Sequence, residues 1–234
     1  MIVAIFALLA VCFGRTRPED HGLLPDGPFA RKTRKTHVET LGGRHFTLSE
    51  ARRTYSFWVF TLSVVLSGLV LTAFSFHVVS IFAGAGMQRS QAVGIFVPAA
   101  CVSVVVELIG SWLSDFVKLK YLAMVQLVGS LVFSLSLAFL GGWASVACVA
   151  LGMGLMQGMF GIISAVTWPR FYGRTHLGAI SGFSTAIVVA GTAVGPYLFS
   201  VAHEQFGTYR PAMLVCAGAA LVLFAASSRA DRPE

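Results

Sequence analysis

Three polar side chains lie inside long apolar runs of this chain and could bind a proton or a small polar solute. Glu107 lies in the run VVVELIG, His77 in FSFHVV and Gln157 in GLMQGMFG. An acidic residue at the centre of a membrane helix costs about 2.5 to 3.5 kcal/mol on insertion scales. Such a residue is therefore kept mostly where it faces other helices or water. These three residues are the candidates for substrate or proton binding.

Small or polar residues accompany Glu107 at helical spacing, namely Ser103, Gly110, Ser111 and Ser114. They form one stripe, and Val, Leu and Ile form the opposite face, which is typical of a membrane helix with a polar inner face. In one interpretation Glu107 binds a proton or a cationic substrate, because a carboxyl group in an apolar setting can alternate between its charged and neutral forms. In the other, Glu107 is a structural partner for polar groups on neighbouring helices.

His77 lies toward the outer end of its apolar segment. It is either a ligand or proton site in an outer cavity, or an interfacial histidine that reaches water. Gln157 shares a helix face with Gly154 and Gly161, so we expect its amide mainly to hydrogen-bond a neighbouring helix. A role for Gln157 as a ligand in a cavity is the alternative.

Closely spaced glycines predict helix packing in two of the apolar segments. The pattern Gly154-x-x-x-Gly158, extended by Gly161, permits two helix backbones to approach closely. In the following segment we expect Gly195 and Pro196 to bend the helix, since a proline leaves a carbonyl group without its usual partner.

The composition is that of an integral membrane protein. Hydrophobic residues make up 56% of the 234 residues and charged residues only 12%, with a mean hydropathy of +0.78, whereas soluble domains are about 25% charged. Apolar segments near the ~20 residues needed to cross a bilayer lie at 55–82, 91–113, 121–140, 143–167, 179–202 and 211–227. Barrel strands would be shorter and would alternate in polarity, so we predict an all-α bundle of six full transmembrane helices.

Residues 1–13 are apolar but too short to cross, because thirteen helical residues span roughly 20 Å of a core about 30 Å thick. They lack the basic start of a signal peptide, so we interpret them as the truncated end of a transmembrane helix. Residues 14–53 form a polar connecting loop, in which Thr47 and Glu50 have the spacing of a capping box and predict a short helix. Residues 54–228 then form the transmembrane domain and residues 229–234 a tail.

The basic residues favour one side of the predicted bundle. Of the seventeen Lys and Arg residues, fifteen lie in the 14–53 loop, in the segments after the second and fourth spans, and in the tail; only Arg89 and Arg210 lie on the other side. The positive-inside rule therefore places the loop and the C-terminus in the cytoplasm. The same distribution accounts for the pI of about 9.6 without a nucleic-acid partner.

The sequence lacks the usual patterns of an enzyme or a metalloprotein. The four cysteines lie in apolar runs without CxxC spacing, which argues against a zinc site or a disulfide framework. There is no glycine-rich phosphate loop, His-Glu-x-x-His pattern or nucleophile elbow. We therefore expect no enzymatic activity, no metal and no cofactor.

The segment 111–120, SWLSDFVKLK, lies in the basic loop between the second and third spans and resembles a known motif. The major facilitator superfamily carries Gly-x-Leu-Ala/Ser-Asp-Arg-x-Gly-Arg/Lys-Lys in such a loop. The matching residues are Leu113, Ser114, Asp115 and Lys120. The departures are Ser111, Phe116, Lys118 and Leu119. The resemblance implies that Asp115, Lys118 and Lys120 help to latch the cytoplasmic side, although Phe116 replaces the arginine of a full latch. The alternative is an ordinary basic loop.

Three further stretches, 17–27, 47–58 and 171–196, resemble bacterial members near the oxalate/formate and monocarboxylate porters. The resemblance covers the second half of such a protein, from the end of span six to span twelve, and implies that the first half is missing. It implies a bacterial plasma (inner) membrane location. It also places Glu107 on a span that faces the central cavity, and the Phe76-His77 pair is similar to one in monocarboxylate-like members.

The function implied by this resemblance is secondary active transport of a small organic solute, coupled to protons, by alternating access of two halves. A carboxylate is one candidate solute, although no Lys or Arg inside a span offers it an anchor. Besides lipid, solute and proton, the expected partner is the missing N-terminal half or a second copy of the chain. The alternative is an inactive fragment or a non-transporting structural or interaction module of the membrane.

Overall fold

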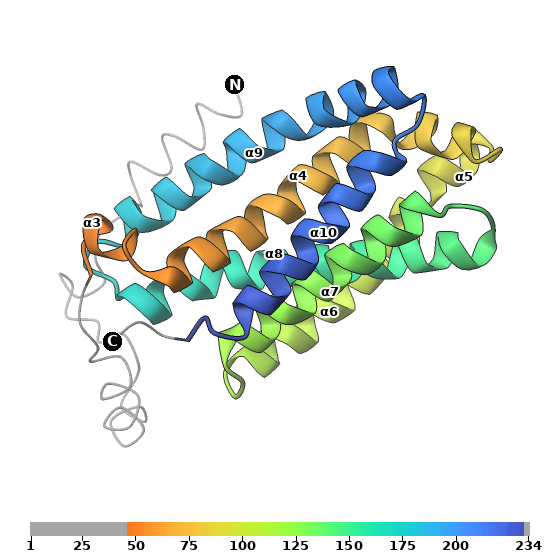
Figure 1. Ribbon diagram of the computed structural model, residues 1–234. Coiled ribbons are helices and arrows are strands. Elements are labelled where there is room, and N and C mark those ends of the chain that lie inside the picture. The colour runs from red at the N-terminus through yellow and green to blue at the C-terminus, as the bar shows by residue number, and fades with distance from the viewer. Residues whose placement is uncertain (1–45, 232–234) are drawn as a thin grey trace, which may run out of the picture. The chain divides into compact units, whose positions relative to one another are not determined.

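The computed structural model describes residues 46–231 (Figure 1). The predictions for residues 1–13, for 14–45 and for the last three residues lie outside the described residues. Between residues 46 and 231 the chain forms helices and no strand. The helices are α3 (Leu48–Ala51), α4 (Tyr55–Gly84), α5 (Arg89–Gly94), α6 (Phe96–Ser114), α7 (Leu119–Ala138), α8 (Trp143–Tyr172), α9 (Leu177–Phe206) and α10 (Arg210–Ser227).

Six helical segments in this range are long and apolar enough to cross a membrane, with α5 and α6 together counting as one. This confirms the prediction of an all-α membrane fold. The predicted limits are close to those observed, but two helices run further than expected. The fourth segment was predicted to end at residue 167 and α8 ends at Tyr172; the fifth was predicted to end at residue 202 and α9 ends at Phe206.

The second predicted span, 91–113, is interrupted in the structure. Helix α5 ends at Gly94 and α6 begins at Phe96, with Ile95 between them. Pro98 explains the break, because it has no N–H to donate to the carbonyl group of Gly94 and its ring crowds that carbonyl. The break is local, because Ile95 keeps helical backbone angles and α5 and α6 together form the one span that the sequence predicts.

Two capped turns begin the membrane domain, and the sequence predicts the first of them. The backbone N–H of Thr47 donates to the Glu50 carboxylate at 2.8 Å, and the N–H of Glu50 donates to the Thr47 hydroxyl at 3.4 Å. This reciprocal pair is the predicted capping box. The Thr54 hydroxyl then caps α4 through the N–H of Phe57 at 3.4 Å.

The helices pack in a small number of extensive pairs. Helix α8 packs against both α6 and α7, α4 packs chiefly against α9, and α10 packs against α7 (Figure 1). Glycines permit the closest approaches between neighbouring helices. A Cβ on Gly152 of α8 would lie 2.5 Å from the backbone nitrogen of Phe133 in α7, and one on Gly129 would lie 2.7 Å from that of Met156.

The apolar core lies between α4, α7, α8 and α10, whereas α6 and α9 lie at the periphery. In the most apolar window of each helix, 61% of α4 residues and 56% of α8 residues are buried, but only 17% of those in α5–α6 and 11% of those in α9. Helices α6 and α9 therefore each present a long apolar face that no described residue covers.

Four segments far apart in the sequence meet at one end of the bundle. The N–H of Phe46 donates to the carbonyl of Tyr172 at 3.2 Å. Arg170 contacts the end of α6, and Lys120 contacts the segment that follows α10. We call this the basic end, because it holds Arg52, Arg53, Lys118, Lys120, Arg170, Arg174 and Arg229. The opposite end holds the remaining described Lys and Arg residues, Arg89 and Arg210.

Candidate functional site

Glu107 lies at the edge of the contact between α6 and α8. Its side chain is exposed, and its carboxylate lies over Gly161, where a Cβ would come within 3.3 Å of Oε1. Within residues 46–231 no side chain forms a hydrogen bond or an ion pair with this carboxylate. In a membrane such a group needs a proton or a partner, because an unpaired charge in an apolar medium is costly.

Two members of the stripe of small residues beside Glu107 pack against α8. A Cβ on Gly110 would lie 2.6 Å from the side chain of Ile162, and one on Gly158 would lie 2.7 Å from the carbonyl oxygen of Ser103. The expected polar inner face of this span is thus in part a helix–helix contact, with Glu107 and Ser111 on its exposed side.

The predicted packing glycines lie in two different contacts. A Cβ on Gly154 would lie 2.5 Å from Val102 Cβ, so this glycine lies in the contact of α8 with α6. One on Gly195 would lie 2.5 Å from the carbonyl oxygen of Leu69, in the contact of α9 with α4. Helix α9 continues through Pro196 from Leu177 to Phe206.

The structure gives Gln157 and Gln126 different environments. Gln157 is exposed, and its expected hydrogen bond to a neighbouring helix is not found among the described residues. Gln126 in α7 is fully buried instead, and its amide donates to the Ser67 hydroxyl of α4 at 2.9 Å. Ser67 in turn lies 3.3 Å from the Ser130 hydroxyl. Gln126 is not among the predicted site residues, although an amide within an apolar span is a signal that the sequence carries.

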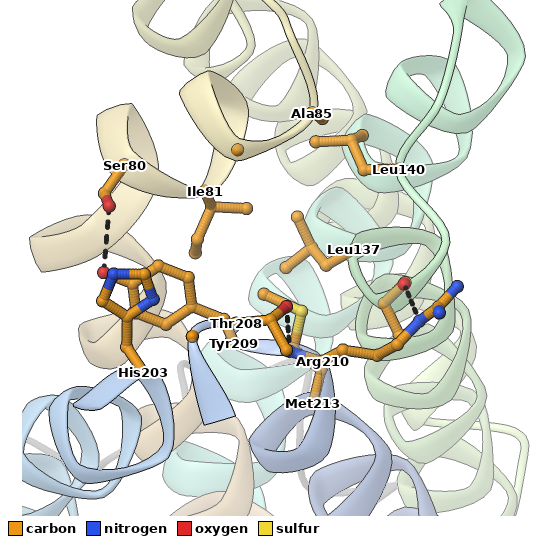
Figure 2. A pocket seen from close by; sticks show the side chains of 13 residues that line it. Ser80, Ile81, Ala85, Leu137, Leu140, His203, Thr208, Tyr209, Arg210 and Met213 are labelled. Atoms are coloured by element: carbon orange, nitrogen blue, oxygen red, sulfur yellow. Dashed lines mark hydrogen bonds between the residues drawn. The ribbon is translucent and has the colours of Figure 1, made fainter. Parts of the chain in front are cut away.

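His77 lies where α4, α9 and the start of α10 meet. Its Nε2 is 3.1 Å from the carbonyl oxygen of Pro196 and 3.4 Å from the Ser200 hydroxyl. Its Nδ1 is 3.4 Å from the hydroxyl of Tyr209, which contacts the Ser80 hydroxyl at 3.0 Å. Figure 2 shows the Tyr209 ring with Ser80 on one side and His203 stacked on it, at a centroid distance of 4.4 Å.

These contacts can accommodate His77 in both of its charge states. A carbonyl oxygen only accepts, so Nε2 carries a hydrogen toward Pro196. In the neutral ring, Nδ1 then accepts from the Tyr209 hydroxyl. In the cationic ring, Nδ1–H donates to Tyr209, and Tyr209 donates to Ser80. The Tyr209 and Ser80 hydroxyl groups can thus turn to match either arrangement of hydrogens on the His77 ring.

An arginine from a helix distant in sequence contacts the basic loop. Arg170, near the end of α8, donates through Nη1 to the carbonyl oxygen of Ser114 at 2.6 Å, and its Nη2 lies 4.0 Å from Asp115 Oδ1. The side chain of Asp115 is 76% exposed, so the ion pair itself contributes little. The stronger link is the charge-assisted hydrogen bond to the end of α6.

The two lysines of the loop motif contact the segment after α10 and not Asp115. Lys120 Nζ lies 2.8 Å from Asp231 Oδ2, and Lys118 Nζ lies 3.8 Å from Oδ1. The hydrogen bond from Lys120, together with the charges of both lysines, holds the pKa of Asp231 below its usual value. Asp231 also accepts a hydrogen bond from Ser56 of α4 through its carbonyl oxygen. The segment after α10 is thereby attached to the starts of α4 and α7.

No known protein-family model matches this chain, and no curated protein matches it. A functional assignment therefore depends on the resemblance of the loop segments and on the arrangement of the helices.

Proposed function

We propose that this chain forms one half of a secondary transporter of the major facilitator type, which moves a small organic solute by alternating access and couples it to protons. The basic end is cytoplasmic, in a bacterial plasma membrane. The observation that carries the proposal is the pairing of the helices.

The helices divide into two groups of three, with α5–α6 counted as one. The first group is α4, α5–α6 and α7, and the second is α8, α9 and α10. The middle member of each group packs mainly against the first member of the other, α6 against α8 and α9 against α4. Because α4 begins at the basic end and α8 at the opposite end, the two groups are inverted. Inverted three-helix repeats occur within each half of major facilitator transporters.

The uncovered faces of α6 and α9 support the need for a partner. In the most apolar stretch of each helix, only 17% of the α5–α6 residues and 11% of the α9 residues are buried. Glu107 and Gln157 are exposed. Polar groups left unpaired in lipid cost several kcal/mol each. We propose that a second set of helices, an N-terminal half or another copy, covers these faces and encloses the pathway.

Two groups are suited to carry the coupled proton. Glu107 lies without a partner among the described residues at the margin of the uncovered face. His77 has hydroxyl neighbours that suit both of its charge states.

A proton-flux assay on the intact assembly tests this proposal. The chain is purified from membranes in mild detergent through a tag on its C-terminus, which retains any bound partner, and its protein mass is measured by light scattering. The assembly is then reconstituted into vesicles with a trapped pH dye and an imposed pH gradient. We expect a mass above that of one chain and saturable proton flux with one class of organic solute.

A panel of monocarboxylates, dicarboxylates, amino acids, sugars and organic cations identifies that class. A stable monomer that transports would contradict the need for a partner. An assembly of correct mass in which no solute moves protons would favour the alternative, a structural or interaction module of the membrane.

A further inference from the structure

We infer that the opposite end of the bundle holds a binding site for a small organic anion with an apolar body, distinct from the Glu107 face. A pocket of about 370 Å³ opens there between the ends of α4, α7 and α9 and the start of α10 (Figure 2). Pockets that bind small molecules commonly measure about 300 to 1,000 Å³. The inference stands on this pocket and does not depend on transport.

The lining of the pocket combines an apolar wall with a few polar groups. The apolar side chains that Figure 2 labels are Ile81, Ala85, Leu137, Leu140 and Met213. The polar side chains are Ser80, His203, Thr208, Tyr209 and Arg210. Polar atoms form the larger share of this lining, so the polar groups would orient a ligand while the apolar side chains contact its body.

The charge of the lining selects an anion. No acidic residue lines the pocket, whereas Arg210 and the titratable side chain of His203 do. Arg210 has no ion-pair partner within residues 46–231. A ligand with a carboxylate would supply the missing counter-charge, whereas an organic cation would meet a guanidinium without compensation.

Arg210 is held in one orientation and keeps donors to spare. Its Nε–H donates to the carbonyl oxygen of Ala138 at 2.9 Å, and its guanidinium lies 4.6 Å from the centroid of the Phe139 ring. A guanidinium has five N–H donors, and those on the two outer nitrogens of Arg210 have no partner within residues 46–231, so they remain for a ligand at the edge of the pocket. A planar fork fixed in this way is well suited to a carboxylate.

A purely structural role for Arg210 is the competing explanation. Ala138 is the last residue of α7, and a cation at the C-terminal end of a helix is favourable. Such a cap, however, would not account for the pocket beside it or for the second polar group, Tyr209, whose ring forms another part of the lining. The test must therefore measure ligand binding and selectivity in addition to stability.

Equilibrium binding to the purified protein in detergent tests the inference. The probe is benzoate, and the matched neutral probe is benzamide, which has nearly the same shape without the charge. Isothermal titration calorimetry should give saturable benzoate binding and at least tenfold weaker benzamide binding. Equal affinity for the two probes, or no saturable benzoate binding, would overturn the inference.

Two variants and one control locate the site. Arg210→Gln should weaken benzoate binding at least tenfold, whereas Arg89→Gln, which removes the other basic side chain of the same end, should leave it unchanged. Leu140→Trp should block binding by filling the pocket while leaving Arg210 in place. Should Arg210→Gln prove unstable, Leu140→Trp decides the matter. Benzoate binding that is unchanged in Leu140→Trp would overturn the inference, whereas its loss there would support it.

Discussion

The carboxylate of Glu107 in α6 lies directly over Gly161 in α8, where a Cβ would come within 3.3 Å of Oε1. This glycine differs from Gly154, seven residues earlier on the same helix, where a Cβ would lie 2.5 Å from Val102 Cβ and 2.9 Å from a backbone carbonyl oxygen. The first glycine adjoins a flexible side chain, and the second adjoins the body of a neighbouring helix.

The two glycines should therefore respond differently to the same substitution. In a helix, Ala is favoured over Gly by about 1 kcal/mol, whereas overpacking a close contact costs roughly 1 to 3 kcal/mol. Gly161→Ala should be neutral or slightly stabilising, because the Glu107 side chain can move by a few tenths of an ångström. Gly154→Ala should lower the midpoint of thermal unfolding in detergent. Equal midpoints for the two variants would contradict this account of the α6–α8 contact.

Glu107→Gln tests whether this carboxyl group carries the coupled proton. The amide has nearly the same shape but cannot take up and release a proton, so proton-driven uptake by the reconstituted assembly should be lost. Exchange of solute across the membrane should remain, because it needs no net proton movement. Glu204→Gln, at the exposed end of α9, is the matched control and should behave as the unmodified protein. Normal accumulation by Glu107→Gln would leave only a structural role for this residue.

The attachment of the segment after α10 should depend on pH through Asp231. Its folded-state pKa lies below 3.8, the value of an unperturbed aspartate. The ion pair with Lys120 therefore adds stability above pH 3.8. The contribution is lost as the pH falls through the lower, folded-state pKa. A nitroxide spin label at residue 228 should therefore be ordered at neutral pH and become mobile only in strong acid.

Substitution of the carboxylate separates this effect from general acid unfolding. Asp231→Asn should make the same label mobile already at pH 7, while the unfolding midpoint of the bundle changes little, since Asp231 is exposed. A label that stays equally ordered in the Asn variant would show that the bond from Ser56 to the Asp231 carbonyl is sufficient for attachment.

The separation of the basic end from the opposite end predicts the orientation of the chain in the membrane. In a variant without native cysteines, a single Cys at Thr175 reports on the basic end and a single Cys at Thr208 on the opposite end. A membrane-impermeant thiol reagent added to intact cells should label position 208 and not position 175, because basic loops remain in the cytoplasm. Labelling of position 175 alone would reverse the proposed orientation.

Features that depend on local spacing follow from the amino-acid sequence alone. The apolar spans follow from hydropathy summed along the chain, and the capping box of Thr47 and Glu50 follows from hydrogen bonds within one turn. The break at Ile95 belongs to the same class, since the effect of Pro98 on the preceding turn is local. Hydropathy alone does not reveal it, because Pro98 lies within an otherwise continuous apolar run.

Only the tertiary structure decided which surfaces meet. The spacing around Glu107 indicates a polar stripe, but the same spacing suits a cavity wall or a helix contact. In the structure, Gly110 of this stripe packs against Ile162 of α8. Likewise, no local pattern relates Arg170 to Ser114 or Tyr209 to His77, because these pairs are far apart in the sequence. Helix pairing depends on the complementary shapes of two whole surfaces, and a single helix carries only one of them.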